Sequence, residues 1–148
     1  MKFTYVLLAT VISFDLQGQI PLLGSPKAEI EKKLSYDIGT GMIATDSTIS
    51  YNLSTDPQGY IRVTCHFSRE ENCSMIIYSS DDAGTYAYYL DRVIEDPKYR
   101  WRKINGNQYV SKYRKKLLLE TDPDPSKQAF RVLPAQWTRE TYRTFTFD

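Results

Sequence analysis

The chain has 148 residues and a formal charge of +1, and its apolar (41%) and charged (25%) fractions are those of an ordinary globular protein. This composition excludes a disordered chain, because enough apolar side chains are present to offset the entropy lost when the backbone is ordered. Two cysteines and seven glycines exclude a disulfide-dense scaffold and a collagen-like chain. The length favours a single domain with a substantial core, which we place at residues 19–148.

The N-terminus predicts an export signal over residues 1–18. Met1-Lys2 precedes a mostly apolar run from Phe3 to Phe14, which is too short to span a bilayer but fits the apolar region of a signal peptide. Gly18 is the small residue expected before cleavage. We therefore expect a mature chain beginning near Gln19, in the periplasm or the extracellular space and without a transmembrane segment. The alternative is that the run is a buried strand or helix of the fold.

The first half of the mature chain predicts a helix followed by a three-stranded meander. Ser25-Pro26 is a favoured helix start, and Ile30 and Leu34 lie one turn apart, which indicates an amphipathic helix over residues 26–35. Alternation then predicts strands at Thr48–Ser54, Tyr60–Phe67 and Cys73–Ser80, joined by a turn at Asp56–Gly59 and a polar tip at Ser68–Asn72.

The second half predicts one helix and further strands. Apolar residues spaced three and four apart give the clearest helical pattern, over Thr85–Glu95. Strands are expected at Tyr99–Ile104 and Gln108–Glu120 around the hairpin dipeptide Asn105-Gly106, then at Gln128–Leu133 and, as a C-terminal edge strand, at Tyr142–Phe147. Local hairpins favour an α+β fold, with an antiparallel sheet of about five to six strands and two helices packed on one face.

Cys65 and Cys73 lie on either side of the predicted polar tip. If Val63 faces Met75, the two cysteines face each other and can form a cross-strand disulfide, which export would favour. In a second register Cys65 faces Ile77, and the thiols are then too far apart to bond. The sequence leaves both registers open.

The segment Lys98–Lys116 carries eight basic residues and no acidic one, and aromatic residues interleave with them. Such a segment predicts a surface for an anionic partner, such as an anionic glycan, lipopolysaccharide or an acidic envelope protein. Export disfavours nucleic acid. The alternatives are a hairpin with one buried aromatic face and one solvated basic face, or pairing with the acidic remainder of the chain. The candidate residues are Tyr99, Arg100, Trp101, Arg102, Lys112 and Arg114.

We find no pattern for a catalytic residue, a metal or a cofactor. His66 is the single histidine, so the usual structural zinc sites and a supported Ser-His-Asp triad are missing. The acidic clusters at Glu70-Glu71, Asp81-Asp82 and Asp122/Asp124 fall in predicted turns. We expect a non-enzymatic binding or adaptor domain; the alternative is a small secreted hydrolase that acts on a cell-wall or extracellular polymer through a carboxylate pair.

The stretch from Leu22 to Leu34, LLGSPKAEIEKKL, resembles an opening found in small exported bacterial proteins. In the SmpA/OmlA-type outer-membrane-assembly proteins and the β-lactamase-inhibitor-like domains, a helix of this pattern precedes an antiparallel sheet. The resemblance implies the same helix-then-sheet order in this chain. It assigns no functional residue.

Overall fold

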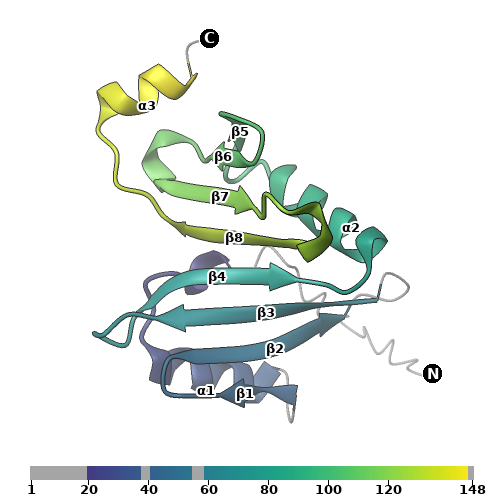
Figure 1. The fold of residues 1–148 in the computed structure, drawn as a ribbon. Helices are drawn as coiled ribbons and strands as arrows, with labels where there is room; N and C mark the ends of the chain where they lie inside the picture. Colours follow the sequence, from purple (N-terminus) through teal and green to yellow (C-terminus); the bar gives the residue numbers. More distant parts are fainter. Residues whose placement is uncertain (1–19, 38–40, 55–58, 147–148) are drawn as a thin grey trace, which may run out of the picture.

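A computed structural model of the chain describes residues 20–37, 41–54 and 59–146. The predicted signal segment at 1–18 and residues 56–58 of the predicted turn lie outside these ranges. The described part is an α+β fold built on one antiparallel sheet of eight strands, in the order β1-β2-β3-β4-β8-β7-β6-β5 (Figure 1). The strands are β1 (Ile43–Ala44), β2 (Thr48–Ser54), β3 (Tyr60–Phe67), β4 (Cys73–Ser79), β5 (Arg102–Lys103), β6 (Gln108–Val110), β7 (Leu117–Thr121) and β8 (Ala129–Pro134). The α-helices are α1 (Lys27–Asp37), α2 (Ala83–Ile94) and α3 (Arg139–Thr146).

The predicted meander is confirmed. Strands β2 and β3 have the predicted bounds, and β4 ends one residue before the predicted end. Every second residue of β2 from Ile49 to Leu53 is buried, and the same holds for β3 from Ile61 to Cys65. Tyr51 pairs directly with Val63 on this core face. Period-two alternation therefore placed these strands correctly, because their other face carries polar and partly exposed residues.

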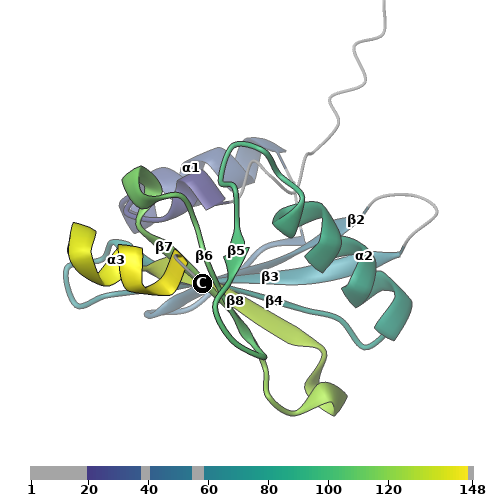
Figure 2. The ribbon, with the colours of Figure 1, turned by 90° about the horizontal axis from the view of Figure 1, so that it is seen from above.

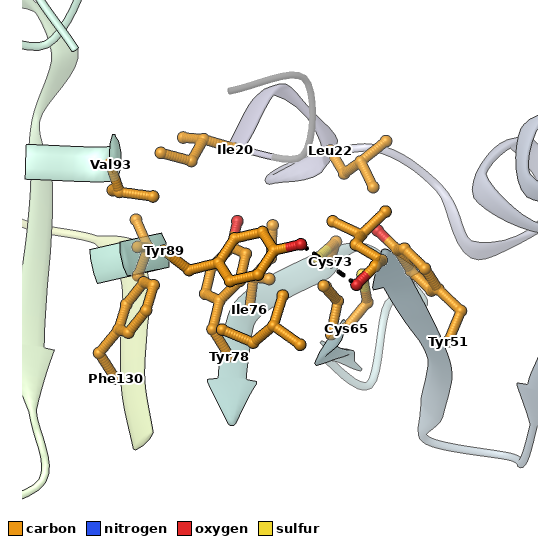
Figure 3. Close-up of a cluster of buried hydrophobic side chains, with 14 of the residues drawn as sticks. Ile20, Leu22, Tyr51, Cys65, Cys73, Ile76, Tyr78, Tyr89, Val93 and Phe130 are labelled. Carbon is orange, nitrogen blue, oxygen red and sulfur yellow. Dashed lines mark hydrogen bonds between the residues drawn. The ribbon is translucent and has the colours of Figure 1, made fainter. Parts of the chain in front are cut away.

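The core lies between one face of the sheet and the helices α1 and α2, which lie on the same side of the sheet in Figure 2. Both helices are confirmed close to their predicted ranges. Ile30 and Leu34 of α1 and Tyr89 and Val93 of α2 are buried in this core. A 3-10 turn, η2 (Ile20–Leu22), adds two more buried apolar side chains over the sheet (Figure 3). Residues just after the predicted cleavage point are thus part of the core.

The sheet has more strands than the five to six predicted. The short strand β1 extends the edge beside β2, and the predicted strand Gln108–Glu120 is in fact two strands, β6 and β7, joined by the 3-10 turn η4 (Tyr113–Lys115). Lys116 ends this turn in the left-handed conformation, with φ of 48°. The hydroxyl of Ser111 accepts the N–H of Leu117 at 3.0 Å. The chain therefore reverses within residues 108–120, which carry no glycine or proline to signal a turn.

The predicted C-terminal edge strand is wrong, because residues 139–146 form the helix α3. Thr138 caps this helix, since its Oγ1 accepts the N–H of Thr141 at 3.2 Å. The ring of Tyr142 packs against Tyr113 and Trp137, with centroids 5.5 and 5.9 Å apart. The alternating Thr and aromatic residues favour a strand locally, and the cap and these tertiary contacts override that preference.

Neither predicted register around the cysteines is correct. Cys65 pairs with Ile76, and Cys73 pairs with Phe67, because a β-bulge shifts the register between His66 and Phe67. The bulge adds one residue to β4, so that Cys73 and Ile76 both reach the core face although their spacing is odd. The register in which Val63 faces Met75 would place Met75 and Ile77 on the core face, but both residues are only half-buried.

Candidate anion-binding site

Basic side chains from three separate segments meet in one groove of about 680 Å³. Arg102 begins β5, Lys112 and Arg114 belong to the turn around η4, and Arg139 and Arg143 lie on α3. We call this the basic groove, and its lining residues are Arg102, Lys112, Tyr113, Arg114, Arg139, Tyr142 and Arg143. Helix α3 lies beyond the β5–β8 end of the sheet, away from β1 and β2 (Figure 1).

Three of the six candidate residues predicted from sequence line the basic groove, and three do not. Arg102, Lys112 and Arg114 are in the groove. Tyr99 is a core residue, only 2% exposed, and Trp101 packs half-buried beside it with ring centroids 5.8 Å apart. Arg100 is exposed, with a left-handed φ of 51°, and is not among the lining residues. Tyr99 and Trp101 therefore serve the core, in agreement with the alternative of a buried aromatic face, whereas Tyr113 of the same segment lines the groove.

The environment of Tyr99 agrees with this structural role. Burial, followed by the nearby carboxylate of Asp96, raises the pKa of Tyr99 to about 12. The ammonium groups of Lys98 and Lys115 lie 5.4 and 5.9 Å from the centroid of its ring. These two lysines cover a core aromatic residue from outside, as cation–π contacts do.

A chain of packed aromatic side chains holds the walls of the basic groove relative to each other. Trp137 packs on Tyr142, Tyr142 packs on Tyr113, and the ammonium of Lys116 lies 5.7 Å from the ring centroid of Tyr113. These contacts join α3 to η4. The cations on the two segments are therefore held around one groove rather than on two independent surfaces.

Sequence reasoning missed Arg139, Tyr142 and Arg143 as groove residues. Arg139 and Arg143 are four residues apart, so in a helix they lie one turn apart on one side. In the predicted strand the same spacing would have put residues of one face about 13 Å apart. The sequence does contain a helix signal here, namely a capping threonine, Thr138, followed by two arginines four residues apart. The alternating pattern that follows favours a strand and masks this signal.

The charge of the basic groove is of one sign. Its lining residues, as far as the structure describes them, include five cations and no aspartate or glutamate. Clustered like charges cost free energy in the folded state, so a site of this kind is stabilised by an anion that binds to it.

Cys65 and Cys73 are free thiols, both buried, and lie 4.3 Å apart without a disulfide. The bulge in β4 brings them to this distance, although they are not directly paired. The neighbouring Cys73 thiol, followed by burial, raises the pKa of the Cys65 thiol. His66 points to the other face of β3 and is half-buried, so it does not form a Cys–His pair with Cys65.

The acidic clusters have structural roles where their contacts are described. Asp82 caps α2 by accepting the N–H of Thr85 at 2.7 Å, and this hydrogen bond lowers the pKa of its carboxyl group. Asp124 accepts hydrogen bonds from Ser126, and these lower its pKa in the same way. In the described ranges, no three metal-ligating side chains come together.

A second hollow of about 350 Å³ is lined in part by Glu120 and Asp122. Glu120 pairs with Arg131 at 2.6 Å and accepts a hydrogen bond from Gln108, also at 2.6 Å. Both oxygens of its carboxylate are therefore already bound by side chains of the neighbouring strands.

The chain matches no protein-family model, no curated protein and no solved structure. The resemblance of residues 22–34 to small exported bacterial proteins therefore stays an expectation. Among the helices that the structure describes, none is long and apolar enough to cross a membrane.

Proposed function

We propose that the chain is an exported, non-enzymatic binding or adaptor domain of the periplasm or the extracellular space, and that the basic groove is its contact surface for an anionic partner. The observation that carries the proposal is the convergence of five cations from three separate segments on one groove. The partner classes that this chemistry fits are an anionic glycan, lipopolysaccharide or an acidic surface of an envelope protein.

Binding at this groove is expected to depend on salt. Arg102, Arg114, Arg139 and Arg143 are exposed, and interactions between exposed charges are screened over about 8 Å at physiological ionic strength. Four of the five cations come from two sides, the turn around η4 and the helix α3, so each side should contribute to the binding of one ligand.

The test is elution of the purified full chain from a heparin column, a general polyanion, in a salt gradient. We expect Lys112→Gln/Arg114→Gln and Arg139→Gln/Arg143→Gln each to elute at lower salt than the unaltered chain. The matched control is Lys32→Gln/Lys33→Gln, which removes the same charge from exposed positions of α1. If all three variants eluted at the same salt concentration, heparin retention would depend on net charge alone and the groove would not be the binding surface.

Export is tested by the intact mass of the protein recovered from fractionated native cells. We expect the exported fraction to contain a chain that begins near Gln19. A full-length chain in the cytoplasmic fraction would overturn the export proposal, and partners inside the cell would then have to be considered for the basic groove.

The hydrolase alternative gains no specific support from the described carboxylates. A glycoside hydrolase needs a protonated carboxylic acid whose pKa is raised, facing a second carboxylate across a cleft. Hydrogen bonds lower the pKa values of Asp82 and Asp124, which is the opposite direction. Asp96 is buried, but its Oδ1 accepts the N–H of Lys98 at 2.8 Å and closes the turn after α2.

A further inference from the structure

The aromatic rings of the basic groove are already occupied by protein neighbours. The ring of Tyr113 packs at a tilt against Tyr142 and has the ammonium of Lys116 5.7 Å from its centroid, and the ring of Tyr142 also packs at a tilt against Trp137. Sequence-tolerant binding of single-stranded nucleic acid needs open ring faces on which bases can stack. The rings of this groove hold α3 against η4 instead, so recognition must come from the cations.

Four of the five cations in the groove are arginines. A guanidinium group presents its N–H donors as a planar fork, which binds the oxygens of a phosphate or a carboxylate in pairs. The forks of Arg114, Arg139 and Arg143, together with the ammonium of Lys112, call for a ligand that carries several negative charges. One carboxylate would leave most of the repulsion among the cations in place.

The size of the groove limits how these charges are arranged. A volume of about 680 Å³ lies within the range of small-molecule sites, roughly 300–1,000 Å³. A ligand moiety that fills the groove must therefore carry its charges in a small volume. A phosphomonoester carries a charge of about −1.5 to −2 at neutral pH on three acceptor oxygens, so it delivers more charge in a given volume than a carboxylate does.

Building on the proposed binding function, we propose that the basic groove recognises a compact ligand with two or more phosphate groups. The same chemistry is found in a free polyphosphorylated small molecule and in the phosphorylated headgroup of a glycolipid. In either case Arg139 and Arg143 bind from the α3 side, and Lys112 and Arg114 from the η4 side.

The first experiment is isothermal titration calorimetry of the full chain at fixed salt with three probes: tripolyphosphate, citrate and a single-stranded DNA oligonucleotide. We expect tripolyphosphate to bind at least tenfold more tightly than citrate, which carries several carboxylates on a molecule of similar size. A charge-assisted hydrogen bond contributes about 1.5–3 kcal/mol, so Arg139→Gln/Arg143→Gln should weaken tripolyphosphate binding by at least about tenfold. Lys32→Gln/Lys33→Gln should bind it as the unaltered chain does.

The outcomes separate this inference from the function on which it rests. Equal affinity for citrate and tripolyphosphate, lost in the α3 variant, would overturn the phosphate preference but leave an anion-binding groove. Tighter binding of the oligonucleotide, again lost in the α3 variant, would overturn the inference in favour of nucleic acid. No measurable binding of any probe, together with no retention on heparin, would overturn both proposals.

A second experiment distinguishes the two sources of phosphate once tripolyphosphate is found to bind. The chain is sedimented with phosphatidylcholine vesicles that contain or lack diphosphorylated lipid A. Sedimentation only with lipid A, competed by tripolyphosphate, would support the inference and identify a lipid headgroup as the source. Absence of sedimentation would support the inference with a free ligand as the source.

Discussion

Two buried tyrosines of the core differ in what their hydroxyl groups contact. Tyr89 donates a hydrogen bond to the carbonyl of Leu53 at 3.4 Å, shown as a dashed line in Figure 3. The hydroxyl of Tyr78 is fully buried and has no hydrogen-bond partner among the described residues. A buried polar group without a partner costs free energy, whereas a bonded one recovers most of that cost.

We therefore expect opposite effects from the same substitution at these two positions. Tyr78→Phe should leave the free energy of unfolding unchanged or raise it by up to about 1 kcal/mol, and Tyr89→Phe should lower it by about 0.5–1 kcal/mol. Urea unfolding followed by circular dichroism measures both. A loss in Tyr78→Phe as large as in Tyr89→Phe would mean that the Tyr78 hydroxyl has a partner, such as a buried water.

At the scale of elements, α2 shows local and tertiary preferences in agreement. Its apolar residues follow the helical period, Asp82 caps its first turn, and Tyr89 and Val93 are buried against the sheet. In α3 the local pattern favoured a strand, and only the Thr138 cap and the Tyr113 and Trp137 contacts of Tyr142 account for the helix. Helix α2 could be predicted because its local pattern agrees with its tertiary contacts. Helix α3 could not, because its local pattern favours a strand.

The Asp82 cap predicts a pH-dependent stability. Hydrogen bonds hold the pKa of Asp82 below its usual value, so the ionised cap stabilises the fold fully above the unfolded-state pKa of about 3.9. This contribution is lost as the pH falls through the lower folded-state pKa. We expect Asp82→Ala to lower the free energy of unfolding at pH 7, with Asp82→Asn in between because Asn also caps.

The check is denaturant unfolding of these variants at neutral and acidic pH. The difference in the free energy of unfolding between the unaltered chain and Asp82→Ala should become smaller as the pH falls below about 3.9. A gap that stays constant across this range would show that the substitution acts through helix propensity or packing rather than through the ionised cap.

At the scale of the whole molecule, the sheet consists of two parts that meet at one seam. Strands β1 to β4 form one antiparallel part, β5 to β8 form the other, and β4 pairs with β8 between them (Figure 1). At this seam Tyr78 pairs directly with Phe130, and their rings stack with centroids 4.6 Å apart. The basic groove is formed by β5, the turn around η4 and α3, on the β5–β8 side of this seam.

We expect Phe130→Ala to lower the free energy of unfolding by about 3–5 kcal/mol, because it removes a fully buried ring and leaves a cavity. Phe145→Ala, at a position of α3 that is 41% exposed, is the control and should have little effect. Circular dichroism and the fluorescence of Trp101 and Trp137 should report one shared transition. Separate transitions would mean that the two parts of the sheet unfold independently.

The sequence alone determined the elements in which local pattern and burial agree. The helices α1 and α2 and the strands β2, β3, β4 and β8 were predicted close to their observed bounds, because one-sided burial forces a period of 3.6 or 2 on the apolar residues. The sequence also indicated Arg102, Lys112 and Arg114 as candidates for an anion-binding surface, because a run of basic residues can be seen without knowledge of the fold.

Tertiary structure alone decided the turn at η4, the bulge in β4, the helix α3 and the completion of the basic groove by Arg139 and Arg143. The helix α3 and the completed groove depend on contacts between residues distant in the chain, such as Tyr113 with Tyr142. Secondary-structure propensity reflects only the residue and its near neighbours in sequence. These contacts bury side chains against segments far away in the chain, and a local sequence pattern does not show which segments will meet.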